Sequence, residues 1–321
     1  MHEPAISVVV PTHDRVSLLA RAIKSVLAQS FERFELIVVD DGSSDDTAQF
    51  VESVGDDRVR ALSHEQALGV AAARNTGVRH ARAPLVAFLD DDDEYEPEFL
   101  SRMHEAFDGS PVSVGLAWCG ICWMHDDANG ERVVHPHDLW WPRFASREQA
   151  YRGFLRARRI GTNSGLVLRR SVFDRVGDFD ASLKCASDTE FLIRVVREFD
   201  FTVVPEPLIR VHGHDGPRLR SSPPRAATYR KIIERHRAVL ESDADLWADV
   251  HYKTGWVHYH AGDRSAGRRF MLSALKRRPW HRKALGALLL FEVSGRRAPQ
   301  LHTRLSNVRR RFRTPTGVSS G

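Results

Sequence analysis

The stretch ISVVVPT, residues 6–12, is a near-continuous run of β-branched residues that ends in proline and threonine. Runs of this kind are typical of strands that are buried on both faces of a parallel sheet. Three further strand patterns follow it, at residues 34–42 (FELIVVDDG), 58–64 (RVRALSH) and 83–93 (APLVAFLDDDD), and helical patterns separate the four. This alternation predicts an α/β fold, a Rossmann-like and mostly parallel sheet with flanking helices.

The pattern changes beyond residue 112. Further strands are expected at residues 113–127, 164–173 and 201–212, and helices at 147–156 and 188–198. A break rich in Pro, Gly, Ser and Arg follows at residues 214–227. Amphipathic helical patterns then cover residues 228–242, 246–262, 263–279 and 281–293, with a spacing that resembles one tetratricopeptide unit. We predict a first domain at 1–213, a linker at 214–227 and a C-terminal α-helical appendage with a basic tail at 228–321.

Composition and charge favour a globular protein and argue against some functions. The 321 residues are 42% hydrophobic, enough for a packed core, and the net charge of +5 is unevenly placed. An acidic run lies in the first third and a basic tail at the end, which argues against a nucleic-acid-binding protein. The few cysteines, Cys119, Cys122 and Cys185, indicate a reducing compartment, and CGIC is expected to be core strand.

The sequence begins without the pattern of a signal peptide and has no apolar run of bilayer-spanning length. We therefore expect a cytoplasmic protein. The basic C-terminal region, including RRPWHRK (residues 277–283) and RRRFR (residues 309–313), suits peripheral contact with the inner face of the cell membrane.

Polar side chains close three of the predicted strands. Thr12 ends the first strand, Asp40 and Asp41 the second, and the run Asp90–Asp93 the fourth. In parallel sheets ligands bind beyond the carboxyl ends of the strands, so these groups are expected to converge on one crevice. Two simpler interpretations stay open, a solvated acidic turn for the aspartate run and a plain Asx turn with helix capping for the preceding pair.

The aspartate run suits a hard divalent cation. Mg²⁺ or Mn²⁺ takes one or two protein carboxylates, and diphosphate oxygens and water complete its shell. Alternate side chains of an extended chain point the same way, so Asp90 and Asp92 are expected on one face and Asp91 and Asp93 on the other. One pair could meet the cation while the other binds a ribose or orders the loop.

Four ordered segments, ISVVVPTHDR, SVLAQSFERFELIVVDDGSSDDT, GVAAARNTGVRHA and VAFLDDDDEYEPEFL, together resemble a family 2 glycosyltransferase of the GT-A fold. The resemblance implies a nucleotide-diphosphate sugar, most simply a UDP-sugar, Mn²⁺ or Mg²⁺ as cofactor, and inversion at the anomeric carbon. It implies a direct metal ligand at Asp92 with Asp90, and a ribose contact at Asp91, leaving Asp93 and Glu94 behind these or in solvent. The other implied nucleotide-sugar contacts are Pro11, Thr12, Asp14, Asp40, Asp41 (at the uracil base), Arg74 and Asn75.

The same resemblance implies an acceptor side. Inversion needs a general base that takes a proton from the acceptor hydroxyl. KCASDTEFLIRVVRE supplies Asp188 for this role and Glu190 as a second acid, although Ser187 stands where the family usually has an acid. The alternative is that Ser187 and Asp188 cap a helix. Asn163 and Ser164 are expected to line the sugar pocket, and His212 to touch phosphate or metal.

Rival functions remain at this stage. A non-catalytic module that binds sugar nucleotides would keep Asp92 and lose the base, and the Ser187 departure is compatible with it. A nucleotidyltransferase would carry a glycine-rich phosphate loop after the first strand, where PTHDRVS has no glycine. The absence of a transmembrane pattern and of a Q-x-x-R-W segment favours addition of one sugar, to a glycan or lipid-linked acceptor, over processive synthesis.

Overall fold

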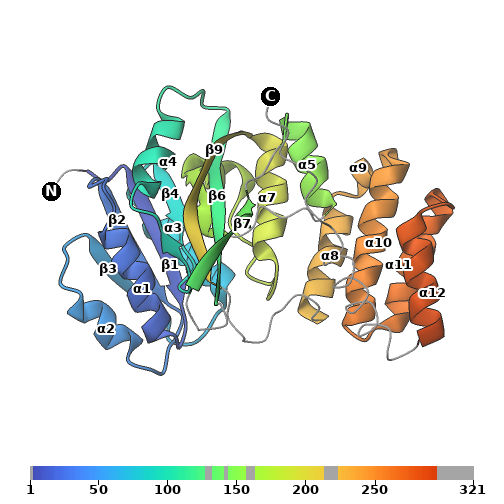
Figure 1. The fold of residues 1–321 in the computed structure, drawn as a ribbon, viewed down its shortest axis with the longest axis horizontal. Coiled ribbons are helices and arrows are strands. Elements are labelled where there is room, and N and C mark those ends of the chain that lie inside the picture. The colour runs from blue at the N-terminus through green and yellow to red at the C-terminus, as the bar shows by residue number, and fades with distance from the viewer. Residues whose placement is uncertain (1–2, 127–131, 141–143, 157–162, 213–222, 295–321) are drawn as a thin grey trace. The chain divides into compact units, whose positions relative to one another are not determined.

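The computed structural model describes residues 3–126, 132–140, 144–156, 163–212 and 223–294 (Figure 1). By its internal contacts the chain divides into two compact units, Met1–Pro217 and Arg218–Gly321. The division falls inside the predicted linker, of which residues 214–222 lie outside the described ranges, as does the basic segment RRRFR.

The first unit contains one mixed sheet, to which nine strands contribute in the described residues, in the order β3-β2-β1-β4-β8-β6-β9-β5 with β7 paired to β6. The strands are β1 (Ile6–Thr12), β2 (Phe34–Asp40), β3 (Val59–Ser63), β4 (Leu85–Phe88), β5 (Glu94–Tyr95), β6 (Val114–Asp126), β7 (Arg132–Trp140), β8 (Leu166–Arg169) and β9 (Asp200–His212). The strands β3, β2, β1 and β4 are parallel, whereas β8 runs antiparallel to both of its neighbours. The predicted α/β class is confirmed.

Helices cover both faces of the parallel strands, and the sequence of β1 reflects this. The helices of the unit are α1 (Val16–Leu27), α2 (Thr47–Ser53), α3 (Val70–His80), α4 (Phe99–Phe107), α5 (Arg147–Leu155), α6 (Ser171–Val176) and α7 (Ser187–Glu198), with a 3₁₀ turn η1 (Asn163–Gly165). Val8 and Val10 belong to a core cluster with α1 and α4. Val9 points to the opposite face, where it meets α3. Both faces are therefore apolar, and every residue of β1 is buried.

Gly77 is a weak residue for the interior of α3, but it permits the close approach of that helix to the sheet. A Cβ atom at Gly77 would lie 2.3 Å from Cγ1 of Val9. No real side chain tolerates that distance, so α3 can reach β1 only because this position lacks one. This contact matters for the site, because Arg74 and Asn75 are carried by the same helix.

Two predicted elements of the first unit differ in the structure. The single strand expected at 164–173 is η1, the short strand β8 and then α6, because the chain leaves the sheet after Arg169 and turns into a helix at Ser171. The strands β5 and β7 were not expected at all. Cys119 and Cys122 lie buried on β6 as free thiols, as predicted for core strand.

The second unit is helical in its described part. Its elements are α8 (Pro223–Arg235), α9 (Arg237–Ser242), α10 (Ala244–His260), α11 (Arg264–Arg277) and α12 (Arg282–Ser294). The one helix predicted for 228–242 is thus two, and α8 begins five residues before the expected start. Asp243 and Asp263 cap α10 and α11 by accepting the backbone N–H groups of Leu246 and Ala266. Among the described helices, none has the combination of length and apolarity needed to cross a bilayer.

Candidate active site

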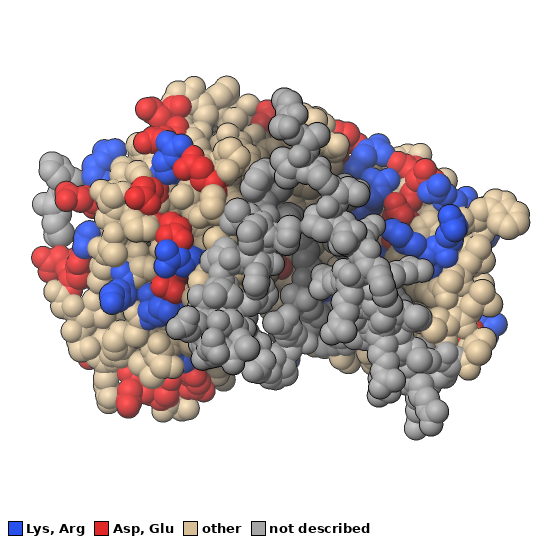
Figure 2. All heavy atoms as spheres, in the orientation of Figure 1, with Lys and Arg blue, Asp and Glu red and all other residues tan. Residues whose placement is uncertain are grey.

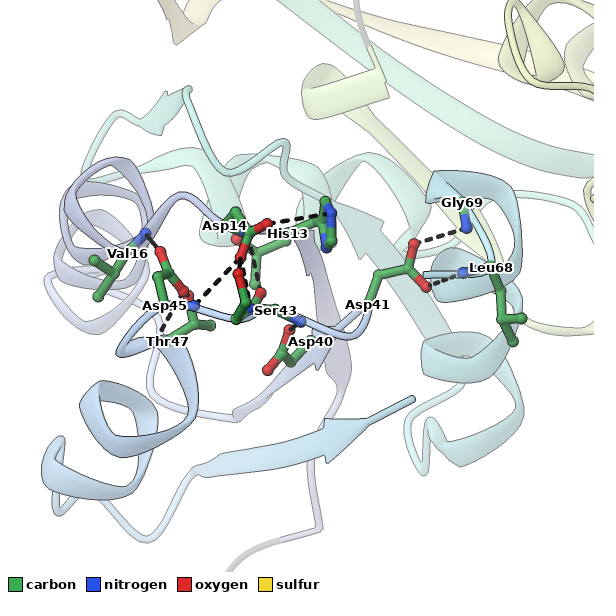
Figure 3. A network of polar contacts seen from close by, with 12 residues as sticks. His13, Asp14, Val16, Asp40, Asp41, Ser43, Asp45, Thr47, Leu68 and Gly69 are labelled. Carbon is green, nitrogen blue, oxygen red and sulfur yellow. Dashed lines mark hydrogen bonds and ion pairs between the residues drawn. The ribbon is translucent and has the colours of Figure 1, made fainter. Parts of the chain in front are cut away.

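The loops after β1 and β2 are joined directly to each other (Figure 3). The side chain of Asp14 accepts the backbone N–H of Ser44 at 2.6 Å, and the backbone N–H of Asp14 donates to the Ser43 hydroxyl at 2.9 Å. These bonds hold Asp14 with a φ of +51°, a left-handed conformation that is uncommon for residues other than glycine. Hydrogen bonds from Ser44 hold the pKa of the Asp14 carboxyl below its ordinary value. Asp14 therefore shapes the loop on which the predicted nucleotide contacts lie.

The end of β4 joins the same group of loops. The hydroxyl of Thr12 donates to Oδ2 of Asp91 at 2.9 Å, across 79 residues of sequence. Pro11 precedes Thr12 on β1 and lies buried opposite Val39 of β2. The convergence of three polar strand ends, predicted from the parallel sheet, is confirmed by these contacts.

Asp40 and Asp41 have different partners. Oδ1 of Asp40 accepts the backbone N–H of Ser43 at 2.9 Å, which is the local turn that the simpler interpretation predicted. Asp41 instead reaches the start of α3, where it accepts the backbone N–H groups of Leu68 and Gly69 at 2.9 and 2.7 Å. Most acceptor positions of the Asp41 carboxylate are therefore used inside the protein.

His64 completes the surroundings of Asp41, and no motif in the sequence pointed to this residue. Its Nδ1 lies 2.7 Å from Oδ1 of Asp41, and its Nε2 lies 2.9 Å from the hydroxyl of Thr76 on α3. Burial alone would raise the pKa of Asp41, but the bonds from His64, Leu68 and Gly69 outweigh burial and lower it. Asp41 is thus an ionised, internally held carboxylate at the end of β2.

The acidic run does not continue β4 as an extended chain. The strand ends at Phe88, and the backbone N–H of Asp93 donates to the carbonyl of Asp90 at 3.1 Å, which closes a turn. The prediction of an extended run is therefore wrong, and the alternation of side chains that rested on it does not apply here. By the donors they share, the acids of the turn form two groups, Asp91 with Asp92 at Arg15 and Asp90 with Asp93 at Ser164.

Arg15 holds the first of these groups. One guanidinium nitrogen of Arg15, NH1, lies 3.1 Å from Oδ1 of Asp91 and 3.3 Å from Oδ2 of Asp92. Asp91 is buried, and burial raises its pKa to about 6 even though Arg15 and Thr12 oppose the rise. Asp92 keeps a side chain that is 19% exposed. The two neighbouring acids therefore differ, one enclosed and one open to solvent.

Ser164 of η1 holds the second group. Its hydroxyl accepts the backbone N–H of Asp90 at 3.1 Å and donates to Oδ2 of Asp93 at 2.5 Å. The expectation that Asp93 could be solvated is wrong, since its side chain is buried and burial raises its pKa well above the ordinary value. Ser164, expected at the sugar pocket, binds the acidic turn.

Arg74 and Asn75 face different parts of the site. The guanidinium of Arg74 donates to Oδ1 of Asp90 at 2.6 Å, and the amide oxygen of Asn163, when turned toward it, accepts from the same guanidinium. Asn75 uses both amide atoms on the backbone of Phe179, each at 2.9 Å. Both polar atoms of the Asn75 side chain are thus bound to the turn that precedes α7.

The donor set suits a divalent cation that keeps ligands from outside the protein. Within the described ranges, no three His, Cys, Asp or Glu side chains form a group that could hold a metal by themselves. Asp90 and Asp92 nevertheless present partly exposed carboxylates, 29% and 19% of each side chain. One or two such carboxylates are what Mg²⁺ or Mn²⁺ takes beside diphosphate and water. His212 is buried with its Nε2 2.5 Å from Oε1 of Glu94, so that nitrogen faces a carboxylate.

The raised pKa of Asp91 predicts a pH dependence of stability. A carboxyl whose pKa rises from 3.8 to about 6 on folding binds more protons in the folded chain. Its contribution to stability is then greatest below pH 3.8 and is lost as the pH rises toward 6. In the absence of divalent metal, this effect should lower the unfolding free energy of the unmodified chain by about 2 kcal/mol between about pH 4.5 and pH 7. Asp91→Asn has no carboxyl at this position and should lack that decrease.

Urea unfolding with a chelator present measures this difference. Asp57→Asn is the matched control, because Asp57 is exposed on the same unit. An Asp91→Asn profile parallel to that of the unmodified chain would contradict the assignment.

Asp188 lies in the first turn of α7. The helix begins after Ala186, whose φ is +55°, and no side chain caps it. Ser187 is buried inside the first turn, so the interpretation of Ser187 as a cap is wrong. Asp188 is half-buried, and its Oδ1 accepts the backbone N–H of Thr189 at 2.7 Å.

Glu190 is not exposed to a substrate. Its side chain is fully buried, and its two oxygens accept from Nε of Arg194, one turn later, at 3.0 and 3.2 Å. Arg194 also donates to the carbonyls of Val176 and Asp178. The predicted second acid of the catalytic pair is therefore part of an ion pair that fixes residues 176–178 against α7.

Removing the charge of Glu190 should destabilise the fold. Glu190→Gln leaves the partly buried guanidinium of Arg194 without its counter-ion, which is expected to cost about 3 kcal/mol of unfolding free energy. Denaturant unfolding measures it. The matched control is Glu148→Gln, which breaks an exposed pair of the same spacing with Arg152 on α5 and should cost less than about 1 kcal/mol. Equal losses in the two variants would contradict the role given to Glu190.

Known structures share this fold. The S. aureus protein TarS, residues 1–349 in complex with UDP-GlcNAc, matches with a TM-score of 0.58 and 17% identity over 85% of this chain and 92% of that one. The mannosyltransferase PcManGT of Pyrobaculum calidifontis, in complex with GDP-Man and Mn²⁺, matches with a TM-score of 0.51 and 18% identity over 96% of this chain and 81% of that one. At such identities the likeness concerns the fold, which is the GT-A arrangement followed by a helical region.

Sequence relatives agree with the fold. The validoxylamine A glucosyltransferase of Streptomyces hygroscopicus subsp. jinggangensis is 38% identical over 140 residues, 42% of this chain and 32% of that protein. The Escherichia coli protein WfgD, a UDP-Glc:alpha-D-GlcNAc-diphosphoundecaprenol beta-1,3-glucosyltransferase, is 39% identical over 93 residues, 29% of this chain and 37% of that one. The chain spans about a third or less of the length of the first such relatives.

The family model supplies the remaining comparison. The model of glycosyl transferase family 2 matches residues 7–177, which is more than half of the 321 residues. The matched segment contains the acidic turn and several of its partners, from Thr12 on β1 to Ser164 of η1. The chain belongs to glycosyl transferase family 2.

Proposed function

We propose that this protein transfers one sugar from a nucleotide-diphosphate sugar to a hydroxyl group of a glycan or lipid-linked acceptor, with inversion at the anomeric carbon. We further propose a UDP-sugar as donor and Mn²⁺ or Mg²⁺ as cofactor. The names of related proteins support these choices, since one binds UDP-GlcNAc, one binds GDP-Man with Mn²⁺, and one is named for a diphosphoundecaprenol acceptor.

One observation carries the proposal. The carboxyl ends of β1, β2 and β4 meet, and the acidic turn at their meeting point is held by donors from Thr12, Arg15 and Ser164. Four consecutive aspartates repel one another, and Arg15 and Arg74 offset part of that repulsion. A bound cation would offset that repulsion and attract a diphosphate.

Within the turn each acid has its own role. Asp92, with Asp90, would hold the cation, which when bound supplies positive charge to a departing diphosphate. Thr12 and Arg15 each bind one oxygen of Asp91, and Asp91 is proposed to order the turn or to contact the ribose of the donor. Arg15 is 44% exposed and lies close to the same acids, so its guanidinium is placed to bind the diphosphate group of an entering donor.

Asp188 supplies the other half of the reaction. Oδ1 is held by the N–H of Thr189, and among the described residues no donor is seen at Oδ2. That oxygen is proposed to take the proton of the acceptor hydroxyl as the hydroxyl attacks the anomeric carbon. The ion pair of Glu190 and Arg194 fixes the start of α7 against residues 176–178, so Glu190 is a positioning residue.

A second function class remains testable. A module that binds sugar nucleotides without turnover would keep the acidic turn. The burial of Glu190, which keeps this carboxylate away from a substrate, is compatible with such a module. A nucleotidyltransferase is disfavoured, since the loop after β1 contains no glycine to cradle a triphosphate.

The test has two stages. A thermal-shift screen of nucleotide sugars with Mn²⁺ identifies the donor, because a ligand that binds the folded state raises the melting temperature. Mass spectrometry then follows sugar transfer to glycan and lipid-linked acceptors. Acceptor-dependent transfer supports the proposal. Donor binding without hydrolysis or transfer, across the acceptor panel, would favour the binding module.

A further inference from the structure

The turn between α11 and α12 presents an unusual surface. Residues 276–283 read KRRPWHRK, and Trp280 at its centre is 86% exposed. A tryptophan side chain normally buries most of its area, so exposure of this extent indicates a binding surface. Figure 2 shows Lys and Arg side chains gathered on the described part of the helical unit.

Part of this turn is fixed to the rest of the helical unit. Arg278 pairs with Asp245 at 2.9 Å, and Nε2 of His281 lies 3.1 Å from Oδ1 of Asp249 on α10. Arg277 lies over the ring of Trp247, 4.8 Å from its centroid. These contacts hold the backbone of the turn, so the exposure of Trp280 is a property of an anchored segment.

Other cations of the turn point outward. Lys276, Arg282 and Lys283 are exposed, and none of the three forms an ion pair with another described residue. We name these three residues and Trp280 the α11–α12 patch. The patch combines three cations with one exposed indole, and the segment 276–283 contains no acid.

Arg282 of the patch shares one face of α12 with two exposed aliphatic residues. Arg282, Gly286, Leu289 and Val293 recur at helical spacing and are all exposed, with Leu289 at 66% and Val293 at 83%. Aliphatic groups beside an indole and cations match the boundary between lipid headgroups and acyl chains. They are less suited to nucleic acid, where aromatic stacking on bases and phosphate contacts carry the binding.

We propose that the α11–α12 patch docks the helical unit on a bilayer surface that carries anionic lipids. The cations lie at the headgroup phosphates, and Trp280 enters the interfacial layer. This inference does not depend on the proposed sugar transfer, because lipid binding is measured without donor or acceptor.

Flotation of the full chain with vesicles tests the proposal. Vesicles of phosphatidylcholine alone are compared with an equimolar mixture of phosphatidylcholine and phosphatidylglycerol. The chain should float with the anionic vesicles only, and added salt should release it. Replacing Lys276, Arg282 and Lys283 together by Gln should weaken partition about a hundredfold, and Trp280→Ala about tenfold.

Matched controls separate the patch from general charge and from the basic C-terminal tail, which every variant retains. Arg230, Arg268 and Arg269 replaced together by Gln remove the same charge from exposed positions elsewhere on the unit, and Leu272→Ala removes an apolar side chain that is 47% exposed. Both controls should lose much less partition than the patch variants. Equal flotation of patch and control variants, or no flotation of the unmodified chain, would overturn the proposal.

Discussion

Replacing Asp188 by asparagine should lower turnover by about a thousandfold, while the affinity for nucleotide stays within about twofold of the unmodified chain. The amide has nearly the shape of the carboxylate and can still accept the N–H of Thr189 at the start of α7. It cannot take a proton from an acceptor hydroxyl. The chemical step should therefore be lost and binding of the donor kept.

Two measurements together check this result. Turnover is followed by acceptor-dependent release of nucleoside diphosphate, and affinity by calorimetry with the diphosphate and Mn²⁺. The matched control is Asp174→Asn, an exposed acid on α6 close to Asp188 in sequence, which should keep full turnover. Unimpaired turnover of Asp188→Asn would exclude Asp188 as the base.

Replacing Asp92 by asparagine should abolish donor binding as well as turnover. Asp92 is the more exposed member of the Asp91–Asp92 group, and its charge is proposed to hold the cation. Without it, the rise in melting temperature that UDP and Mn²⁺ produce together should disappear, and turnover should fall by about a thousandfold or more. Binding and chemistry are then lost together.

Loss of donor binding would distinguish Asp92→Asn from Asp188→Asn. Asp108→Asn, at an exposed position after α4, is the matched control and should keep the joint effect of UDP and Mn²⁺. If Asp92→Asn retains that joint effect, the cation is held elsewhere in the site. A loss confined to turnover would equally contradict the role given to Asp92.

Periodicity predicted the parallel half of the sheet because both of its faces are apolar. In β1, Val8 and Val10 pack on one face of the sheet and Val9 packs on the other. The run is therefore apolar throughout and is recognised as a buried strand. The second half was predicted less well. The strand β5 consists only of Glu94 and Tyr95, and it exists because β9 pairs with it, which no local pattern reveals.

In the candidate site too, local sequence predicted some residues, whereas their partners lie far away in the chain. The rule that ligands bind beyond the strand ends selected Thr12, Asp41 and the acidic turn. The partners of these groups come from far along the chain, with 76 residues between Arg15 and Asp91 and 71 between Ser164 and Asp93. The roles of Arg15, His64 and Ser164 could therefore not be read from the sequence.

A single helix links the two proposed halves of the site. On α3, Arg74 donates to Asp90 in the acidic turn, whereas its neighbour Asn75 binds the backbone of Phe179 across 104 residues. Phe179 lies in the turn that Glu190 and Arg194 also fix in front of α7. The donor side and the start of the Asp188 helix are thus held through adjacent residues of one rigid element.

We propose that Asp188 activates an acceptor that attacks the sugar on the face opposite the departing diphosphate. The most direct test is the anomeric configuration of the product, read by proton NMR from the coupling of the anomeric hydrogen. An α-linked nucleotide sugar should yield a β-linked product with the unmodified chain. A product that retains the α configuration would contradict the account, because a single displacement assisted by one base inverts the centre.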